Sequence, residues 1–287
     1  MKKGNSPMSI DLANVLATQF TEEVKHKFQE SGTLRDSVRV RDVRNAKTVQ
    51  FNLMGRGNAA ERTTIHTAIP LMNITHDPVS VSVKNYTASE LTDIFLDSQV
   101  PFDEKMELVD TIATALGRRL DQIIIDAMVA AAPAKQVADD VSGVSSNLTI
   151  DAIRSAAKML DEDGVPDGDR TLVISPSGLH SLLEDNQATS VDFNNVKALV
   201  RGDLDTFYGF QIKKIGNREE GGLPLSVGAR TCFAYHKAAI GLGVNMEPTV
   251  RIDWDEQYGA HRVTGFLSAG CGVIDDLGLV EISTLES

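Results

Sequence analysis

The chain has 287 residues, which is enough for one large domain or two ordinary ones. Hydrophobic residues make up 42% and charged residues 24%, so the composition is globular rather than disordered. The formal net charge of -12 argues against a protein that grips a phosphate backbone, because such binding depends on Lys and Arg.

The first 46 residues are expected to form an arm. Large apolar side chains recur every four residues at Ile10–Gln29, which predicts an amphipathic helix there. The stretch up to Lys47 holds nine Lys or Arg and six Asp or Glu, so it is mildly basic while the rest of the chain is acidic. Such an arm is either simply exposed or binds a partner.

A pattern of period two replaces the helical one from Val38 onward. Apolar residues alternate up to Leu53, a glycine-rich break follows at 55–58, and a second alternating run occupies Val79–Val83. Together they predict a long two-stranded ribbon with an irregular tip. Because an isolated two-stranded ribbon is marginally stable in water, we expect it to need a partner surface outside its own domain.

The clearest predicted element is a helix at 103–132. Asp103 can cap its first turn, Pro133 ends it, and one apolar stripe runs along it. The stripe consists of Val109, Ile112, Leu116, Leu120, Ile123 and Ala127. A rise of 1.5 Å per residue makes this helix about 45 Å long, so we expect it to act as a spine.

The rest of the chain mixes helices and strands, which indicates an α+β fold. A helix at Ile150–Leu160, a strand at Thr171–Ser175 and a helix at Pro176–Leu183 are predicted in turn. Short strands are expected beyond Val196.

Motifs that carry chemistry are missing from the sequence. The six histidines have no metal-ligand spacing, and neither Gly55–Gly57 nor Gly241–Gly243 completes a phosphate-binding loop. The acidic run Asp161–Asp169 lacks the register of a calcium loop, and Cys232 and Cys271 lack the setting of reactive thiols. We therefore expect no catalytic residue, cofactor or metal, and interpret the chain as an assembly subunit.

Several motifs, in the right order, resemble the major capsid proteins of tailed bacteriophages, which have the HK97-type shell fold, and most of all those of T7-like podophages. The motifs lie at Ala46–Arg56, Val79–Val83, Tyr86–Phe95, Leu116–Asp121, Gly164–Pro176, Leu182–Leu183, Tyr208–Ile212 and Phe233–Gly241.

The resemblance implies an HK97-type capsid fold with five parts. These are an N-terminal arm (1–46), an extended loop or E-loop (47–85), a peripheral or P domain (86–150) with the spine helix at 103–132, an axial or A domain (151–245), and C-terminal strands (246–287) that return to the P domain.

The implied function is that of a structural major capsid protein of the virion, assembled in the host cytoplasm. Hexamers and pentamers would form an icosahedral head that encloses double-stranded DNA without sequence-specific binding, and that involves no membrane. An acidic lining suits this role because it lets the DNA slide. A portal protein and a decoration protein are implied partners. A separate scaffolding protein is expected too, because only a short arm precedes the ribbon.

Two alternatives are an encapsulin-like nanocompartment shell, which has a similar fold, and an α+β enzyme whose site the sequence does not reveal. Electron microscopy of particle size and nucleic-acid content distinguishes the first. Light scattering distinguishes the second, which would be a compact monomer or dimer.

The candidate interface residues lie at the E-loop tip, and they are Met54, Gly55, Arg56, Gly57 and Arg62. Some shells of this fold are welded by a lysine near this tip, but no lysine occurs between Lys47 and Lys84. We therefore expect a non-covalent shell, in which the two arginines pair with carboxylates of an acidic neighbour.

Overall fold

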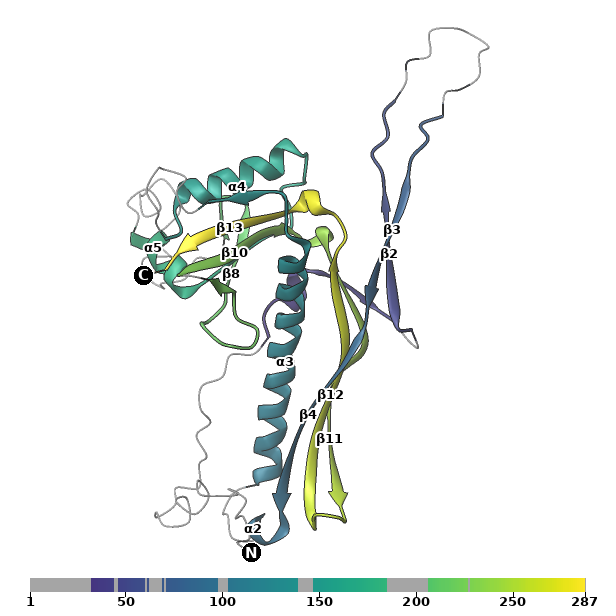
Figure 1. The fold of residues 1–287 in the computed structure, drawn as a ribbon, viewed down its shortest axis with the longest axis vertical. Coiled ribbons are helices and arrows are strands. Elements are labelled where there is room, and N and C mark those ends of the chain that lie inside the picture. Colours follow the sequence, from purple (N-terminus) through teal and green to yellow (C-terminus); the bar gives the residue numbers. More distant parts are fainter. Residues whose placement is uncertain are drawn as a thin grey trace, which may run out of the picture.

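The computed structural model describes residues 32–43, 46–59, 61, 69, 71–97, 103–138, 147–184, 206–226 and 228–286. Two β-sheets, a long helix and a projecting two-stranded ribbon make up this part of the chain (Figure 1). The predicted helix at Ile10–Gln29 and the side chain of Arg62 lie outside the described residues.

A four-stranded sheet forms the long layer of the molecule. Its strand order is β1 (Arg39–Asp42), β11 (Ile240–Asp255), β12 (Ala260–Val273) and β4 (Lys84–Asp93). The short helix α2 (Ile94–Asp97) follows β4. Helix α3 (Glu104–Ala131) runs along one face of this sheet (Figure 1). The approach is close, because a Cβ on Gly265 of β12 would lie 2.4 Å from Cγ2 of Ile112.

Helix α3 matches the predicted spine. The Asp103 side chain accepts a hydrogen bond from the Met106 N–H, and the helix ends where Ala132 turns left-handed with φ 43° just before Pro133. Four of the six predicted stripe residues are buried, whereas Val109 and Ala127 are half-buried. The structure adds buried residues that the predicted stripe omitted, and these are Asp121, Ile124, Ile125 and Met128.

A seven-stranded sheet forms the second layer. Its order is β5 (Gln136–Val137), β13 (Leu279–Leu285), β10 (Ala229–His236), β6 (Arg170–Ile174), β8 (Phe210–Lys214) and β7 (Thr206–Phe207), with β9 (Leu225–Ser226) beside β10. Helices α4 (Ile150–Glu162) and α5 (Pro176–Glu184) lie next to this sheet (Figure 1). All five residues of β6 are buried, as expected for a strand covered on both faces.

Three short 3-10 turns join these elements. They are η1 (Arg35–Ser37), η3 (Lys237–Ala239) and η4 (Asp276–Gly278). One continuous apolar core links α3, α4 and both sheets, while a small second cluster lies under the base of the ribbon. None of the described helices is long and apolar enough to cross a membrane.

Two parts of the chain lie elsewhere than the sequence indicated. Residues 38–43 were expected to begin the ribbon, but β1 instead pairs in parallel with β11, with Arg39 opposite Gly241. Residues 279–285 were expected among the C-terminal strands (246–287) that return to the P domain, but β13 pairs with β10 in the seven-stranded sheet. The physical reason is the same in both cases: alternation identifies a strand and its buried face, but not its neighbour.

Substituting Leu120 by Asp tests the orientation of α3. Leu120 is 5% exposed, so the new carboxylate would lie in the apolar core at a cost of several kcal/mol. We expect the soluble yield of Leu120→Asp to collapse, whereas Ala113→Asp places the same charge on the exposed side of α3 and should fold. Equal yields of the two variants would show that the helix is turned differently.

Candidate assembly elements

The ribbon projects from the body of the molecule (Figure 1). It pairs β2 (Thr48–Met54) with β3 (His76–Ser82) in antiparallel register, from Thr48 opposite Ser82 to Met54 opposite His76. Only its base is buried, through Val49, Phe51 and Val81, which cluster with Ile274. The ribbon is therefore attached to the body at its base, and it lies within residues 47–85, for which an E-loop is predicted.

Four glycines of the long sheet make a seat for the ribbon base. They form two cross-strand pairs, Gly241 with Gly272 and Gly243 with Gly270. A Cβ on Gly241 would lie 2.8 Å from the Phe51 ring, and one on Gly272 would lie 2.7 Å from Val81 Cγ2. A Cβ on Gly243 would lie 2.5 Å from Val49 Cγ2, and one on Gly270 would lie 2.1 Å from the Ser82 carbonyl oxygen. Only glycine allows the ribbon to lie directly on the sheet backbone here.

The predicted tip residues lie just beyond the last ribbon pair. Met54 ends β2 with 61% of its surface exposed, and the Gly55 N–H donates to the Thr75 carbonyl at 2.9 Å. Gly57 passes close to Met72, since a Cβ there would lie 2.9 Å from the Met72 sulfur. Met54, Gly55, Arg56 and Gly57 are thus brought together, while Arg62 cannot be placed because it lies outside the described residues.

Arg56 has a partner within its own chain. Its guanidinium donates to the backbone carbonyl of Asp163, the C-terminal cap residue of α4. A cation at this position is favoured because the carbonyls at a helix C-terminus carry partial negative charge. The expected pairing with a neighbour's carboxylate is therefore not the contact seen in the single subunit.

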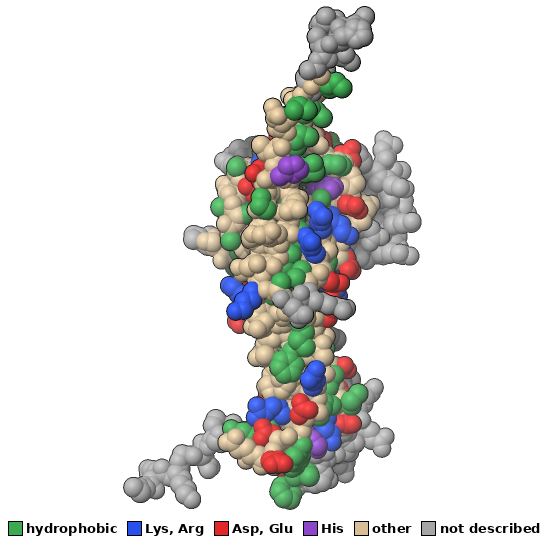
Figure 2. All heavy atoms as spheres, turned by 90° about the vertical axis from the view of Figure 1, so that its right-hand side faces the viewer, with side chains coloured by type: hydrophobic (Ala, Val, Ile, Leu, Met, Phe, Trp, Pro, Cys, Tyr) green, Lys and Arg blue, Asp and Glu red, His purple; other side chains and the backbone are tan. Residues whose placement is uncertain are grey.

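Exposed apolar side chains gather at both ends of the molecule (Figure 2). On the ribbon they are Met54 61%, Ile69 75%, Leu71 83% and Met72 56% exposed. At the opposite end they are Ile94 45%, Phe95 74%, Trp254 47% and Tyr258 56% exposed. Trp254 packs edge-on against His261, with 5.0 Å between the ring centroids. Large exposed apolar surface of this kind marks sites where other molecules bind.

Asp121 is the most deeply buried charged side chain among the described residues. It is fully buried on α3, and its carboxylate accepts from the Thr33 N–H at 2.9 Å and the Leu34 N–H at 3.0 Å. The Arg218 guanidinium donates to it at 2.9 Å. Burial raises the pKa of the Asp121 carboxyl, and the two backbone donors and Arg218 oppose that rise. One side chain thereby joins the end of the arm, the spine helix and the loop at 216–222.

Close backbone contacts surround this carboxylate. Gly32 lies on Gly117 so tightly that a Cβ would be 2.5 Å from the Gly117 carbonyl oxygen. On another side of α3, Gly221 with φ +73° lies over the Arg118 carbonyl, and its N–H donates to the Gln122 side chain at 2.7 Å. The motif Leu116–Asp121 therefore supplies both the glycine and the carboxylate that attach the neighbouring segments to the spine.

The role of Asp121 was not predicted from the sequence. The available signal was its position: a carboxylate next to Leu120, on the side of the helix that also carries Ile124, Ile125 and Met128. A charge on the core side of an amphipathic helix predicts a buried partner, because an unpaired one would be too costly.

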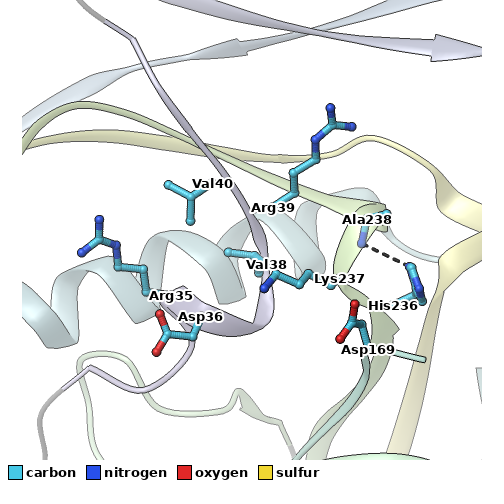
Figure 3. A pocket seen from close by; sticks show the side chains of 9 residues that line it. All are labelled: Arg35, Asp36, Val38, Arg39, Val40, Asp169, His236, Lys237 and Ala238. Atoms are coloured by element: carbon cyan, nitrogen blue, oxygen red, sulfur yellow. Dashed lines mark hydrogen bonds between the residues drawn. The ribbon is translucent and has the colours of Figure 1, made fainter. Parts of the chain in front are cut away.

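A polar cleft of about 780 Å³ lies where the arm meets the seven-stranded sheet (Figure 3). Arg35, Arg39 and Lys237 line it together with Asp36 and Asp169. Arg35 is paired with Glu247. His236 also lines it, and its Nδ1 accepts a hydrogen bond from the Ala238 N–H at 3.2 Å. Charges of both signs around an open hollow do not by themselves make a catalytic site.

Reactive chemistry is not favoured at the thiols. Burial raises the pKa of Cys232 to about 11 and that of Cys271 to about 12, so both stay protonated at neutral pH. Within the described ranges, no three His, Cys, Asp or Glu side chains are grouped so that they could hold a metal ion.

Removal of the Asp121 carboxylate should destabilise the subunit strongly. Asp121→Ala would leave the largely buried Arg218 charge and two N–H groups without their acceptor, at a cost of about 3 kcal/mol or more. The control Asp126→Ala removes an exposed carboxylate from the same helix. Urea unfolding of the two variants measures the difference, and equal midpoints would show that Asp121 is not a structural anchor.

Comparison with solved structures shows the same fold in phage capsids. The capsid of the cyanophage P-SCSP1u matches with a TM-score of 0.75 at 17% identity, over 96% of this chain and 95% of that chain. The mature capsid of bacteriophage PhiM1 matches with a TM-score of 0.68 at 17% identity, over 93% and 91%. The acid-stable capsid of Helicobacter pylori bacteriophage KHP30 matches with a TM-score of 0.72 at 10% identity, over 99% of each chain.

These similarities confirm the α+β HK97-type fold. No curated protein matches the sequence. A family model described as phage capsid protein matches residues 12–286, almost the whole chain. The chain therefore belongs to the phage capsid protein family, as a structural major capsid protein of the virion head and not an enzyme.

Proposed function

We propose that the subunit assembles head to tail, with the ribbon of one copy lying on a neighbouring copy in hexamers and pentamers. The observation that carries this is the ribbon itself, because its base is buried on its own glycine seat while its outer part exposes Leu71 to 83% and Ile69 to 75%. A projecting ribbon of this kind is stabilised when another surface covers it.

The position of the apolar ends supports head-to-tail contacts. Contacts between different surfaces of identical subunits give rings when the rotation closes. The ribbon and the exposed apolar group around Phe95 and Trp254 lie at opposite ends of the long axis (Figure 1). A subunit of this shape can therefore bind one neighbour with each end.

The enclosed cargo is proposed to be double-stranded DNA, held without sequence-specific contacts. The net charge of -12 supports this, since an acidic lining repels phosphate and leaves the DNA free to slide. The match to a phage capsid family favours a genome-filled head over an enzyme-filled nanocompartment. Membership of the T7-like group, a portal, a decoration protein and a separate scaffolding protein stay predictions.

A charge on the exposed ribbon should weaken assembly without harming the subunit. Leu71→Asp changes a side chain that is 83% exposed, so the subunit should keep its unfolding midpoint. Its particle yield should fall strongly, because the carboxylate would be buried between copies. Ala130→Asp, on an exposed part of α3, is the matched control. Negative-stain microscopy measures the yield, and wild-type yield for Leu71→Asp would contradict the proposed ribbon contact.

The shell should be held together without covalent bonds. The ribbon offers arginine rather than lysine between Lys47 and Lys84, and a protonated guanidinium does not attack amides. Mature particles should therefore run as one monomer band on a reducing, denaturing gel. A ladder under these conditions would contradict the prediction. A ladder seen only without reductant would implicate the thiols, which the raised pKa values of Cys232 and Cys271 disfavour.

A further inference from the structure

We propose that the ribbon turns on the four-glycine seat, and that the contact from Arg56 to the end of α4 is a latch that holds it in one position in the free subunit. The proposal rests on the proposed role of the ribbon in assembly, and it adds how the direction of the ribbon is controlled. The seat, the contacts along the ribbon and the cavity beside the ribbon support it.

The seat has few side chains that would fix an angle. Gly241, Gly243, Gly270 and Gly272 present only backbone to the ribbon, because alternate residues such as Leu242 point to the opposite face. Val49, Phe51 and Val81 thus rest mainly on backbone, and Ile274 is the buried side chain of the body that clusters with them. Packing specificity normally comes from interdigitated side chains, so a surface with few of them permits rotation at a lower energetic cost.

The hydrogen bonds near the seat hold the base in place without fixing the outer ribbon. Arg41 of β1 donates to the Gln50 carbonyl at 2.6 Å, and the Val83 N–H donates to the Lys47 carbonyl at 2.9 Å. Both contacts lie at the base of the ribbon, where a turn moves atoms least. Arg56 lies beyond Met54, so its contact with the Asp163 carbonyl opposes rotation with a longer lever arm.

There is also room for the motion. A cavity of about 300 Å³ lies beside the ribbon, lined by Asn52, Leu53 and Arg56 on the ribbon and by Gly164 and Leu277 on the body. The end of β2 therefore borders an open space, although Leu53 also packs against the apolar cluster at the base. Release of Arg56 would let the ribbon adjust to neighbours set at different angles, as pentamers and hexamers require.

The latch can be tested on the free subunit with a distance measurement. Spin labels on Asp77→Cys, exposed on β3, and Lys158→Cys, exposed on α4, report the ribbon position by double electron–electron resonance. Labelling at neutral pH is directed to the introduced thiols, because Cys232 is buried, Cys271 is half-buried, and the raised pKa values of both thiols keep them protonated. A second pair, Asp126→Cys with Lys158→Cys, reports the body alone.

We expect one narrow distance peak for the unaltered ribbon. Arg56→Gln should lower the ratio of latched to unlatched ribbon about three- to tenfold, the effect of losing one hydrogen bond, and so broaden the peak. Arg39 lines the same cavity, so Arg39→Gln is the control that removes the same charge there, and it should leave the peak narrow. Gly243→Ala should shift the peak because its Cβ collides with Val49, whereas Gly168→Ala, which has open space, should not.

The results separate this proposal from the proposed function. A peak that stays equally narrow in Arg56→Gln, or that is already broad with Arg56 present, would overturn the latch. A peak that does not shift in Gly243→Ala would overturn the seat. If the peaks change as expected but Leu71→Asp forms particles as well as the unaltered chain does, the latch stands and the ribbon's role in assembly fails. If Leu71→Asp loses its particles while the peaks stay unchanged, the reverse holds.

Discussion

A carboxylate with no access to water holds the described parts of this subunit together. Asp121 sits on the spine helix, and its oxygens accept hydrogen bonds from two N–H groups at the end of the arm and from Arg218 in a distant loop. Buried N–H groups need acceptors, and an apolar side chain at this position could not supply them. The direction in which the arm leaves the body and the position of the 216–222 loop therefore depend on one residue.

Backbone contacts without side chains are the second organising feature. Gly32 lies on Gly117 beside the Asp121 carboxylate, and the ribbon lies on two glycine pairs of the long sheet. The same kind of approach has different consequences at the two places. Near Asp121 it is reinforced by buried hydrogen bonds, so it fixes the arm. Under the ribbon it is reinforced mainly by apolar contact, which has no preferred direction.

Local signals made the long elements predictable. The cap at Asp103, the stop at Pro133 and the apolar stripe gave the bounds of α3 to within a residue at each end. Strand partners depend on distant segments, so residues 38–43 were assigned to the ribbon rather than to β11, and the pairing of β13 with β10 was not predicted. The glycine seat is visible in the sequence, because glycines two residues apart, such as Gly241 and Gly243, lie on one face of a strand.

The position of Trp254 determines what its fluorescence can report. It is the only tryptophan of the chain, and it lies half-exposed beside His261, next to the turn that joins β11 to β12. This turn is far from the seven-stranded sheet. Tryptophan emission during unfolding would therefore follow the far end of the long sheet alone. Melting of the other layer would show only in a second probe, such as the four tyrosines or circular dichroism. Agreement between the two signals is what would establish that the layers unfold together.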